Sequence, residues 1–253
     1  GAPPPAARPA PRPAGGRRLQ FLHIPKNGGS SVEELGRASG LKWGVHGEGA
    51  KCLDSSTKMW WNCKQAMPDG NACSLYHLPI QLLEGDWNPY KDADVFCITR
   101  HPYERAVSEY KMLCREGSYR EMWAEEMRPE PHKLWVEPLC SAEGLNRFLQ
   151  KTFELYQGGF KFIDDCHHIP QVEYIWNTRG ERMCHHVIQL DGHLIANVAA
   201  LMESKGYAVG ARDVPRGQEG ACPGLTPLNL TASTKRMLQD VYADDFRLLG
   251  FAA

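Results

Sequence analysis

A lysine, two glycines and two serines follow a short apolar segment near the start of the chain. Residues 21–31 read Phe-Leu-His-Ile-Pro-Lys-Asn-Gly-Gly-Ser-Ser, and a helical pattern begins at Val32. Glycines can expose consecutive backbone N–H groups to a ligand, because they have no Cβ. The start of a helix adds unpaired N–H groups and a positive dipole end. The loop predicts a site for an anion with several acceptor oxygens. Its candidate ligands are Lys26, Asn27, Gly28, Gly29, Ser30 and Ser31.

A second strand-to-helix junction carries two arginines and a serine. Residues 95–99 are β-branched and apolar, as in a buried strand, and Arg100 follows them directly. Ligands of open α/β sheets bind at the carboxyl ends of the strands. Arg100 is therefore expected to hold an anion through its guanidinium fork, and Ser108, about two turns into the next helix, to donate to the same anion. The alternative is that Arg100 and Arg105 form ordinary salt bridges.

Both segments resemble motifs of the sulfotransferases that use 3′-phosphoadenosine 5′-phosphosulfate (PAPS). The order Pro-Lys-x-Gly-Gly-Ser-Ser resembles their 5′-phosphosulfate loop, and Arg-x-Pro-x-x-Arg-x-x-Ser resembles their 3′-phosphate segment. A nucleotide P-loop differs, because its lysine follows the glycines. The resemblance implies that residues 26–31 bind the 5′ end of PAPS and that Arg100 and Ser108 bind its 3′-phosphate. It also implies adenosine 3′,5′-bisphosphate as product and no metal.

The second half of the chain extends this resemblance towards the Golgi-type carbohydrate sulfotransferases. Residues 167–171, His-His-Ile-Pro-Gln, are similar to their H-x-x-P-Q segment, and residues 242–246 to their closing Tyr-x-x-Asp-Phe signature. The resemblance covers residues 18–251 and is weakest in the middle. Asn27 stands where the family more often has threonine, and His101 where it more often has aspartate.

Sulfuryl transfer needs a base for the acceptor hydroxyl, donors for the developing charge and an in-line geometry. Lys26 is expected to serve the leaving oxygen. His77 is expected to be the base, because histidine titrates near neutrality and because the family places a catalytic histidine after a corresponding strand. His23, on the strand before the loop, is expected to be structural. The rival bases are His46, His101, His167, His168, Glu84 and Glu109.

Aromatic residues in the segments that would border the acceptor cleft suggest a sugar or another ring-bearing alcohol. The alternative is that most of them anchor the core or loops. These residues are Trp43, Trp60, Trp61, Trp87 and Tyr90. The acceptor stays open between a glycan, a protein tyrosine and a small alcohol, because residues 40–72 and 117–140 are where the resemblance fades.

Apolar runs and helical periodicity alternate along the chain. The expected strands span residues 19–24, 73–76, 94–99 and 187–190, and the expected helices 30–39, 80–84, 103–115, 142–155, 194–205 and 231–248. Such alternation predicts an α/β fold with a parallel sheet flanked by helices on both faces, and the sulfotransferase resemblance implies that this sheet is P-loop-like. Residues 18–253 are expected to form one sulfotransferase domain, after a flexible Pro/Ala/Arg-rich stem at 1–17.

Charge and composition exclude some classes of protein. The net charge of −1 argues against a nucleic-acid binder. No apolar run approaches the roughly 20 residues of a membrane helix, so we expect a type II Golgi protein whose anchor is absent from this chain. A linker after a removed targeting peptide, in a cytoplasmic or organellar protein, is the alternative.

Nine cysteines without a C-x-x-C pair favour a few disulfides over a zinc site. Because nine is odd, at least one cysteine is unpaired within the chain. Cys97, in the centre of a predicted buried strand, is the expected free thiol. Residues 229–231, Asn-Leu-Thr, form a glycosylation sequon.

Two other functions compete with the sulfotransferase interpretation. A Mg²⁺-dependent P-loop kinase or NTPase would need a carboxylate at a strand end, for which Asp191 is the candidate. A catalytically silent nucleotide-binding or lectin-like module would lack a working base at His77.

Overall fold

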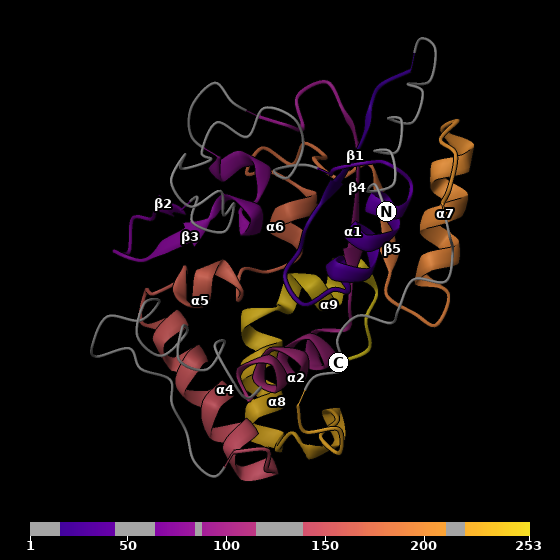
Figure 1. Cartoon of the computed structure of the whole chain (residues 1–253). Helices are drawn as coiled ribbons and strands as arrows, with labels where there is room; N and C mark the ends of the chain where they lie inside the picture. The colour runs from indigo at the N-terminus through magenta and orange to yellow at the C-terminus, as the bar shows by residue number, and fades with distance from the viewer. Residues whose placement is uncertain (1–15, 44–63, 84–87, 115–138, 211–220) are drawn as a thin grey trace, which may run out of the picture.

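The centre of the molecule is a three-stranded parallel sheet (Figure 1). A computed structural model describes residues 16–43, 64–83, 88–114, 139–210 and 221–253. The strands, in spatial order, are β1 (Leu19–Leu22), β4 (Asp94–Thr99) and β5 (His186–Gln189). Because the strands are parallel, their carboxyl ends meet at one edge. The expected α/β architecture with a parallel sheet is confirmed.

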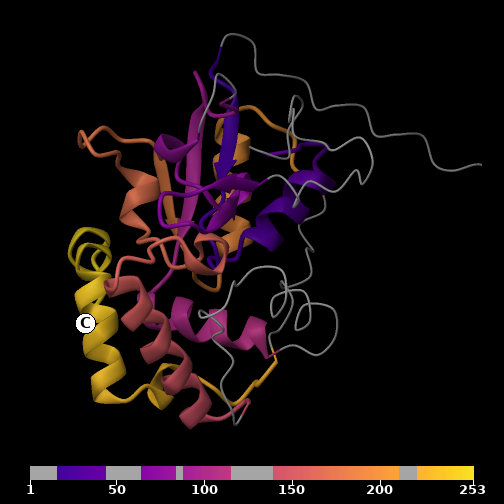
Figure 2. The ribbon, with the colours of Figure 1, turned by 90° about the vertical axis from the view of Figure 1, so that its left-hand side faces the viewer.

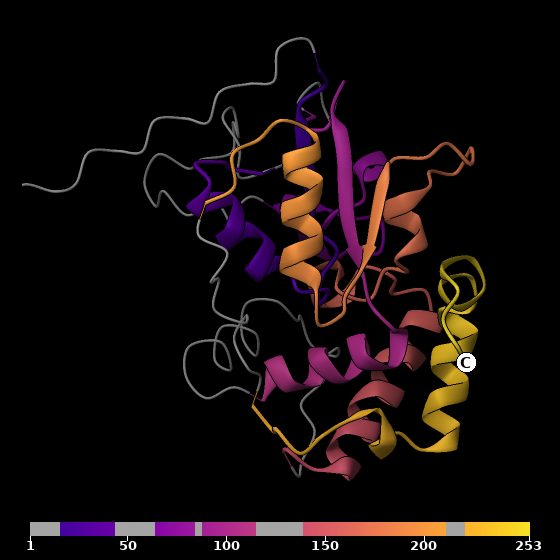
Figure 3. The same ribbon diagram turned by 90° about the vertical axis from the view of Figure 1, so that its right-hand side faces the viewer.

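Side chains alternate between the two faces of β4, as they must in a strand. Phe96 and Ile98 pack against α1 (Gly29–Ala38) and α7 (Leu194–Ser204) on one face. Val95 and Cys97 belong to a second cluster, with α6 (Val172–Ile175), on the other face. Figure 3 shows α7 and α6 on opposite sides of the sheet.

A group of helices lies beyond the carboxyl edge of the sheet (Figures 2 and 3). These helices are α2 (Pro102–Leu113), α4 (Ala142–Gln157), α8 (Ala232–Val241) and α9 (Ala243–Leu249). They enclose a third cluster that includes Tyr110, Phe148 and Leu238. Among the described helices, none combines the length and apolar character needed to cross a membrane.

Most expected elements are present, with different bounds. The expected helix 231–248 is two helices, α8 and α9, which meet at Tyr242. The expected helix 80–84 is a short 3₁₀ turn, Ile80–Leu82. The strand expected at 73–76 is β3 (Ala72–Ser74), which pairs with β2 (Lys64–Ala66) in a separate antiparallel ribbon. The expectation that a strand of the parallel sheet delivers His77 is therefore wrong.

The expectation of a free thiol at Cys97 is also wrong. Cys97 is bonded to Cys184, which lies just before β5. The segment just before β5 places Cys184 beside Cys97. The sequence does not show that these two segments are neighbours, because they are 87 positions apart. The other disulfides among the described residues join Cys73 to Cys166 and Cys140 to Cys222. Cys114 is the free cysteine of the described part, and it is buried.

The aromatic residues expected at an acceptor cleft divide into two sets. Trp43 is buried, and its ring packs edge-on to Phe96 in the core. Tyr90 is buried in the cluster on the opposite face of the sheet. The ring of Trp43 fills the interior, whereas Tyr90, although mostly buried, also lines a pocket with Asn88, Lys91 and His185. Other residues with expected roles lie outside the described part of the chain: residues 1–15 of the stem, His46, Trp60, Trp61, Glu84 and Trp87.

Arg105 joins the helical group to the loops at the sheet edge. Its guanidinium is buried and donates to the backbone oxygens of Pro25, His167 and Ile169. It also lies over the ring of Tyr242, 5.6 Å from the centroid. All three acceptors are neutral carbonyls, so Arg105 fixes backbone segments and is not part of a surface salt bridge.

We expect Arg105→Leu to lower the free energy of unfolding by about 3 to 5 kcal/mol, because three buried carbonyl oxygens lose their donor. Urea unfolding measures the change. Arg37→Leu is the control, because Arg37 is exposed on α1 and pairs with Glu34; it should change stability by less than about 0.5 kcal/mol. Equal effects of the two variants would contradict this role for Arg105.

Candidate functional site

The loop between β1 and α1 lies at the carboxyl edge of the sheet. Lys26 and Gly28 have left-handed backbone, with φ of 67° and 80°. Gly28 is the N-cap of α1; no side chain caps this helix, and its first turn has no acidic residue. The amino end of α1 therefore keeps the polarity that attracts an anion. Lys26 and Gly28 are half-buried, and Ser30 is exposed.

Close packing around the loop explains why glycine stands at positions 28 and 29, which the sequence alone did not reveal. A Cβ on Gly29 would lie 2.3 Å from the imidazole of His23. A Cβ on Gly28 would meet Leu190 and Leu194 at 3.1 Å, and its positive φ is strained for other residues. The glycines let His23 and the start of α7 pack against the loop, whatever the loop binds.

Gln171 links the loop to the end of β4. Its Oε1 accepts from the side chain of Asn27 and from the backbone N–H of Arg100, each at 2.8 Å. Its Nε2 donates to the Arg100 carbonyl and to Asp245. Asn27 also donates to the carbonyl of Ile98, at 2.8 Å. The buried amide of Gln171 therefore connects its own segment by hydrogen bonds to three others, which contain Asn27, Arg100 and Asp245.

Arg100 extends from the end of β4 towards the same loop. Its Nη1 donates to the carbonyl of Lys26 at 3.2 Å, and its Nε to Glu104 at 3.2 Å. A quarter of its side chain is exposed, and its contact with Glu104 is a salt bridge, as the alternative interpretation of Arg100 expected. Ser108 is half-buried and lies one turn beyond Glu104, on the same face of α2. The structure thus brings Arg100 beside the loop and leaves Ser108 farther along α2.

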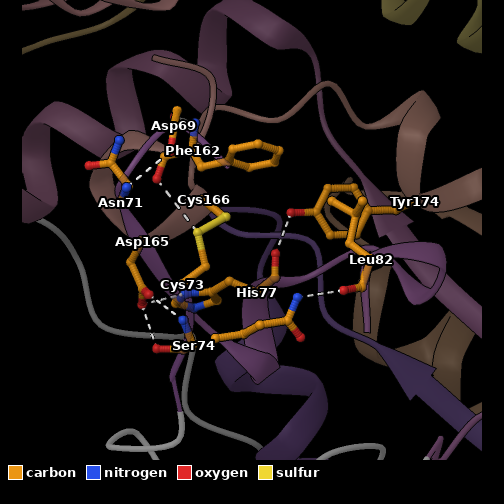
Figure 4. Close-up of a disulfide and its surroundings, with 11 residues drawn as sticks. Asp69, Asn71, Cys73, Ser74, His77, Leu82, Phe162, Asp165, Cys166 and Tyr174 are labelled. Carbon is orange, nitrogen blue, oxygen red and sulfur yellow. Dashed lines mark hydrogen bonds and ion pairs between the residues drawn. A yellow bond between two sulfur atoms is a disulfide. The ribbon is translucent and has the colours of Figure 1, made fainter. Parts of the chain in front are cut away.

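His77 forms a hydrogen-bonded pair with Asp165 (Figure 4). The distance from His77 Nδ1 to Asp165 Oδ2 is 2.8 Å. Asp165 also accepts from the backbone N–H and the hydroxyl of Ser74. Burial raises the pKa of Asp165, but His77 and Ser74 outweigh burial and lower it to about 2. An ionised carboxylate only accepts, so Nδ1 of His77 is the donor and Nε2 is the basic nitrogen.

The backbone that carries Asp165 is strained. Asp164, Asp165 and Cys166 have φ of 52°, 54° and 65°, and none of them is glycine. These residues belong to α5 (Ile163–Cys166), whose interior departs from helical geometry. Left-handed backbone costs about 1–2 kcal/mol for each such residue. Strain of this kind persists only where surrounding contacts determine the backbone, often at functional sites.

A second carboxylate–histidine pair lies against the first. His167 Nδ1 is 2.9 Å from Glu109 Oε2, and both side chains are buried. The His167 ring packs edge-on to His77, 4.4 Å between centroids. Burial lowers the pKa of His167 to about 4, although Glu109 opposes the shift. Burial raises the pKa of Glu109, but His167 and the charge of Lys26 outweigh it and hold that pKa below its ordinary value.

The rival histidines His101 and His168 have local roles, and so has His23. His101 caps α2: its Nδ1 accepts from the N–H of Tyr103, and its Nε2 bonds to the carbonyl of Ala252. A histidine therefore does here what aspartate does at other helix starts. His168 is buried and donates to Asp164 at 2.8 Å. His23 is buried and bonds to Glu33, as a structural residue does.

Two sets of described side chains have the composition of a metal site, but in the set of Cys114, Cys140 and Cys222 the last two form a disulfide. The ligand atoms of His77, Asp165 and His167 lie within 4.8 Å of one another. Asp165 is the residue of this site that sequence reasoning missed. Its only local signal is its place two residues before the H-x-x-P-Q segment. Its partner His77 is 88 positions away, a separation that no periodicity spans.

The comparisons with known proteins add no family. No protein-family model matches the chain, and neither the curated proteins nor the solved structures give a significant match. Functional interpretation therefore rests on the geometry of the site.

We expect the free energy of unfolding to fall by about 2 kcal/mol between pH 7 and pH 5, because His167 stays neutral when folded and takes a proton near pH 6.5 when unfolded. Stability is therefore lost as pH falls below the unfolded pKa. Urea unfolding at a series of pH values measures it. His167→Gln should make the free energy of unfolding depend less on pH. The loss of packing in this variant is measured separately at pH 8, where the histidine is neutral in both states. An unchanged slope would mean that His167 is not held neutral.

Proposed function

We propose that this protein is a PAPS-dependent sulfotransferase that moves a sulfuryl group to an acceptor hydroxyl. One observation carries the proposal. The two segments that resemble the family's cofactor motifs are 74 positions apart, yet Arg100 donates to the carbonyl of Lys26 and Asn27 donates to Ile98. We also propose that the parallel sheet is P-loop-like, with an anion-binding loop between β1 and α1.

The donor set suits the two ends of PAPS. Lys26 and the uncapped amino end of α1 offer a charge and N–H donors to a phosphosulfate. Arg100, partly exposed, offers a fork to a second phosphate. Ser108 is the candidate to complete the 3′-phosphate site. In this role PAPS would supply the sulfuryl group and depart as adenosine 3′,5′-bisphosphate. Lys26 would stabilise the charge on the leaving oxygen.

His77 has the partner that a general base requires. Asp165 holds Nδ1–H, so the lone pair of Nε2 is available for the proton of the acceptor hydroxyl. With PAPS bound, the hydroxyl oxygen would bond to sulfur as the bond from sulfur to the phosphate oxygen breaks, and the proton would pass to Nε2 of His77. Asp165 compensates the imidazolium that forms. Glu109, once a rival base, is engaged with His167.

The acceptor we propose is a carbohydrate hydroxyl, or that of a small ring-bearing alcohol, by the resemblance alone. Three disulfides among the described residues are typical of an oxidising compartment. They are compatible with the Golgi lumen, which stays a prediction. The kinase alternative has less support, because the carboxylate of Asp191 accepts from the N–H of His193 within its own turn.

We expect calorimetric titration to give metal-independent binding of adenosine 3′,5′-bisphosphate. Arg100→Ala should weaken this binding about 10- to 100-fold, through loss of a charge-assisted contact. Arg37→Ala, at the far end of α1, is the control and should bind normally. Binding of ATP that requires Mg²⁺, without binding of the bisphosphate, would overturn the proposal in favour of a kinase-like protein.

We expect His77→Ala to lower kcat for sulfuryl transfer by about 10² to 10⁴, through loss of the base, while bisphosphate affinity stays within twofold. Transfer of ³⁵S from labelled PAPS to a panel of glycans and phenols measures turnover. His101→Asn, which preserves the cap of α2, is the matched control. Near-full turnover of His77→Ala would remove this residue from the mechanism.

A further inference from the structure

The Cys73–Cys166 disulfide joins the two segments that carry the proposed base and its partner. Cys73 directly precedes Ser74 and lies four residues before His77; Cys166 directly follows Asp165. The two cysteines are 93 positions apart, and both are fully buried. Figure 4 shows the disulfide beside the hydrogen bonds of Asp165 to Ser74 and His77. The disulfide and the hydrogen bonds of Asp165 therefore connect the same two segments, one with His77 and one with Asp165.

The segment on the Cys166 side does not hold its shape by local preference. Its three consecutive left-handed residues lie in backbone that L-amino acids disfavour. Asp165 accepts from Ser74 and His77, Asp164 accepts from His168, and Cys166 is bonded to Cys73. The disulfide is the covalent anchor in this set.

The base has anchors of its own on the other segment. The hydroxyl of Tyr174 donates to the carbonyl of His77 at 2.7 Å. The rings of His23 and His167 pack against the His77 ring, at 5.6 and 4.4 Å between centroids. Loss of the disulfide would remove the covalent link that holds the strained Asp165 segment against Ser74, while these contacts keep the His77 ring near its present position.

We propose that the Cys73–Cys166 disulfide is a positioning element for His77, because it holds Asp165 where the carboxylate fixes the Nδ1–H tautomer of the ring. The catalytic meaning rests on the proposed function, since only a base needs a free Nε2. The tautomer itself does not depend on that function. An imidazole that loses its Nδ1 acceptor takes the tautomer set by its remaining partners, and in water the Nε2–H form predominates.

The other disulfides provide matched controls. Cys140–Cys222 also joins distant segments, 82 positions apart, but Cys222 belongs to the cluster of the helical group and Cys140 is exposed. Cys97–Cys184 lies within the core that covers one face of the sheet. Neither bond adjoins Asp165 or Ser74 in sequence, so removing Cys140–Cys222 should affect stability without changing the tautomer of His77.

The test compares Cys73→Ala/Cys166→Ala with Cys140→Ala/Cys222→Ala and wild type. Long-range ¹H–¹⁵N NMR spectra at pH 8.5, with the His77 signals assigned from His77→Gln, report which ring nitrogen carries the proton. We expect Nδ1–H in wild type and in the control, and mainly Nε2–H in Cys73→Ala/Cys166→Ala. The kcat of that variant should fall about 10- to 100-fold, with bisphosphate affinity within twofold.

An unchanged Nδ1–H tautomer in Cys73→Ala/Cys166→Ala would overturn the proposal. If circular dichroism shows that this variant does not fold, Cys73→Val/Cys166→Gly replaces it. Valine fills the void and glycine accepts left-handed backbone, and the tautomer in that variant then decides. Failure of the proposed function can be told apart from failure of this inference. If only the function is wrong, wild type binds no bisphosphate, while the tautomer of His77 still depends on the disulfide.

Discussion

The buried side chain of Gln171 connects the parts of the molecule that must act together. Its oxygen accepts from Asn27 and Arg100, and its nitrogen donates to Arg100 and Asp245. An unmet polar group in the interior would cost free energy, so this amide determines how the loop after β1, the end of β4 and helix α9 approach one another. The site at the sheet edge depends on that arrangement.

Electrostatics at this edge follow from pairing. Asp165 and Glu109 are both buried, and each faces a histidine nitrogen. Burial alone would favour their neutral forms. Hydrogen bonds from the histidines, and the charge of Lys26 near Glu109, reverse that preference. Two ionised carboxylates therefore stand behind two imidazoles, and this fixes which nitrogen of each ring carries a proton.

The strained backbone at residues 164–166 is also a segment that contacts with its surroundings hold in place. The left-handed turn at 164–166 is unfavourable for its residues, yet it directs Asp165 towards Ser74 and His77. Arg105 stabilises the next residues by donating to the carbonyls of His167 and Ile169. The cost of the turn is met by contacts outside it, which is the usual condition for strained backbone at a functional site.

The sequence by itself determined the local elements and the character of the loops. The segment at 94–99 predicted β4 with its observed bounds, because a strand buried on both faces appears as a continuous apolar, β-branched run. The strand–loop–helix order around Lys26, and Arg100 at a strand end, came from the same local patterns. The anion-binding role of these residues is an interpretation that the sequence suggests.

Only the tertiary structure decided which distant residues meet. It paired Cys97 with Cys184, gave His77 its partner Asp165 and moved β3 out of the parallel sheet. It also broke the last helix at Tyr242, whose buried hydroxyl bonds to the carbonyl of His168. The physical reason is common to all of these. Backbone preference and hydrophobic period act over a few residues, whereas a disulfide, a buried hydrogen bond or a sheet edge depends on packing across the whole chain.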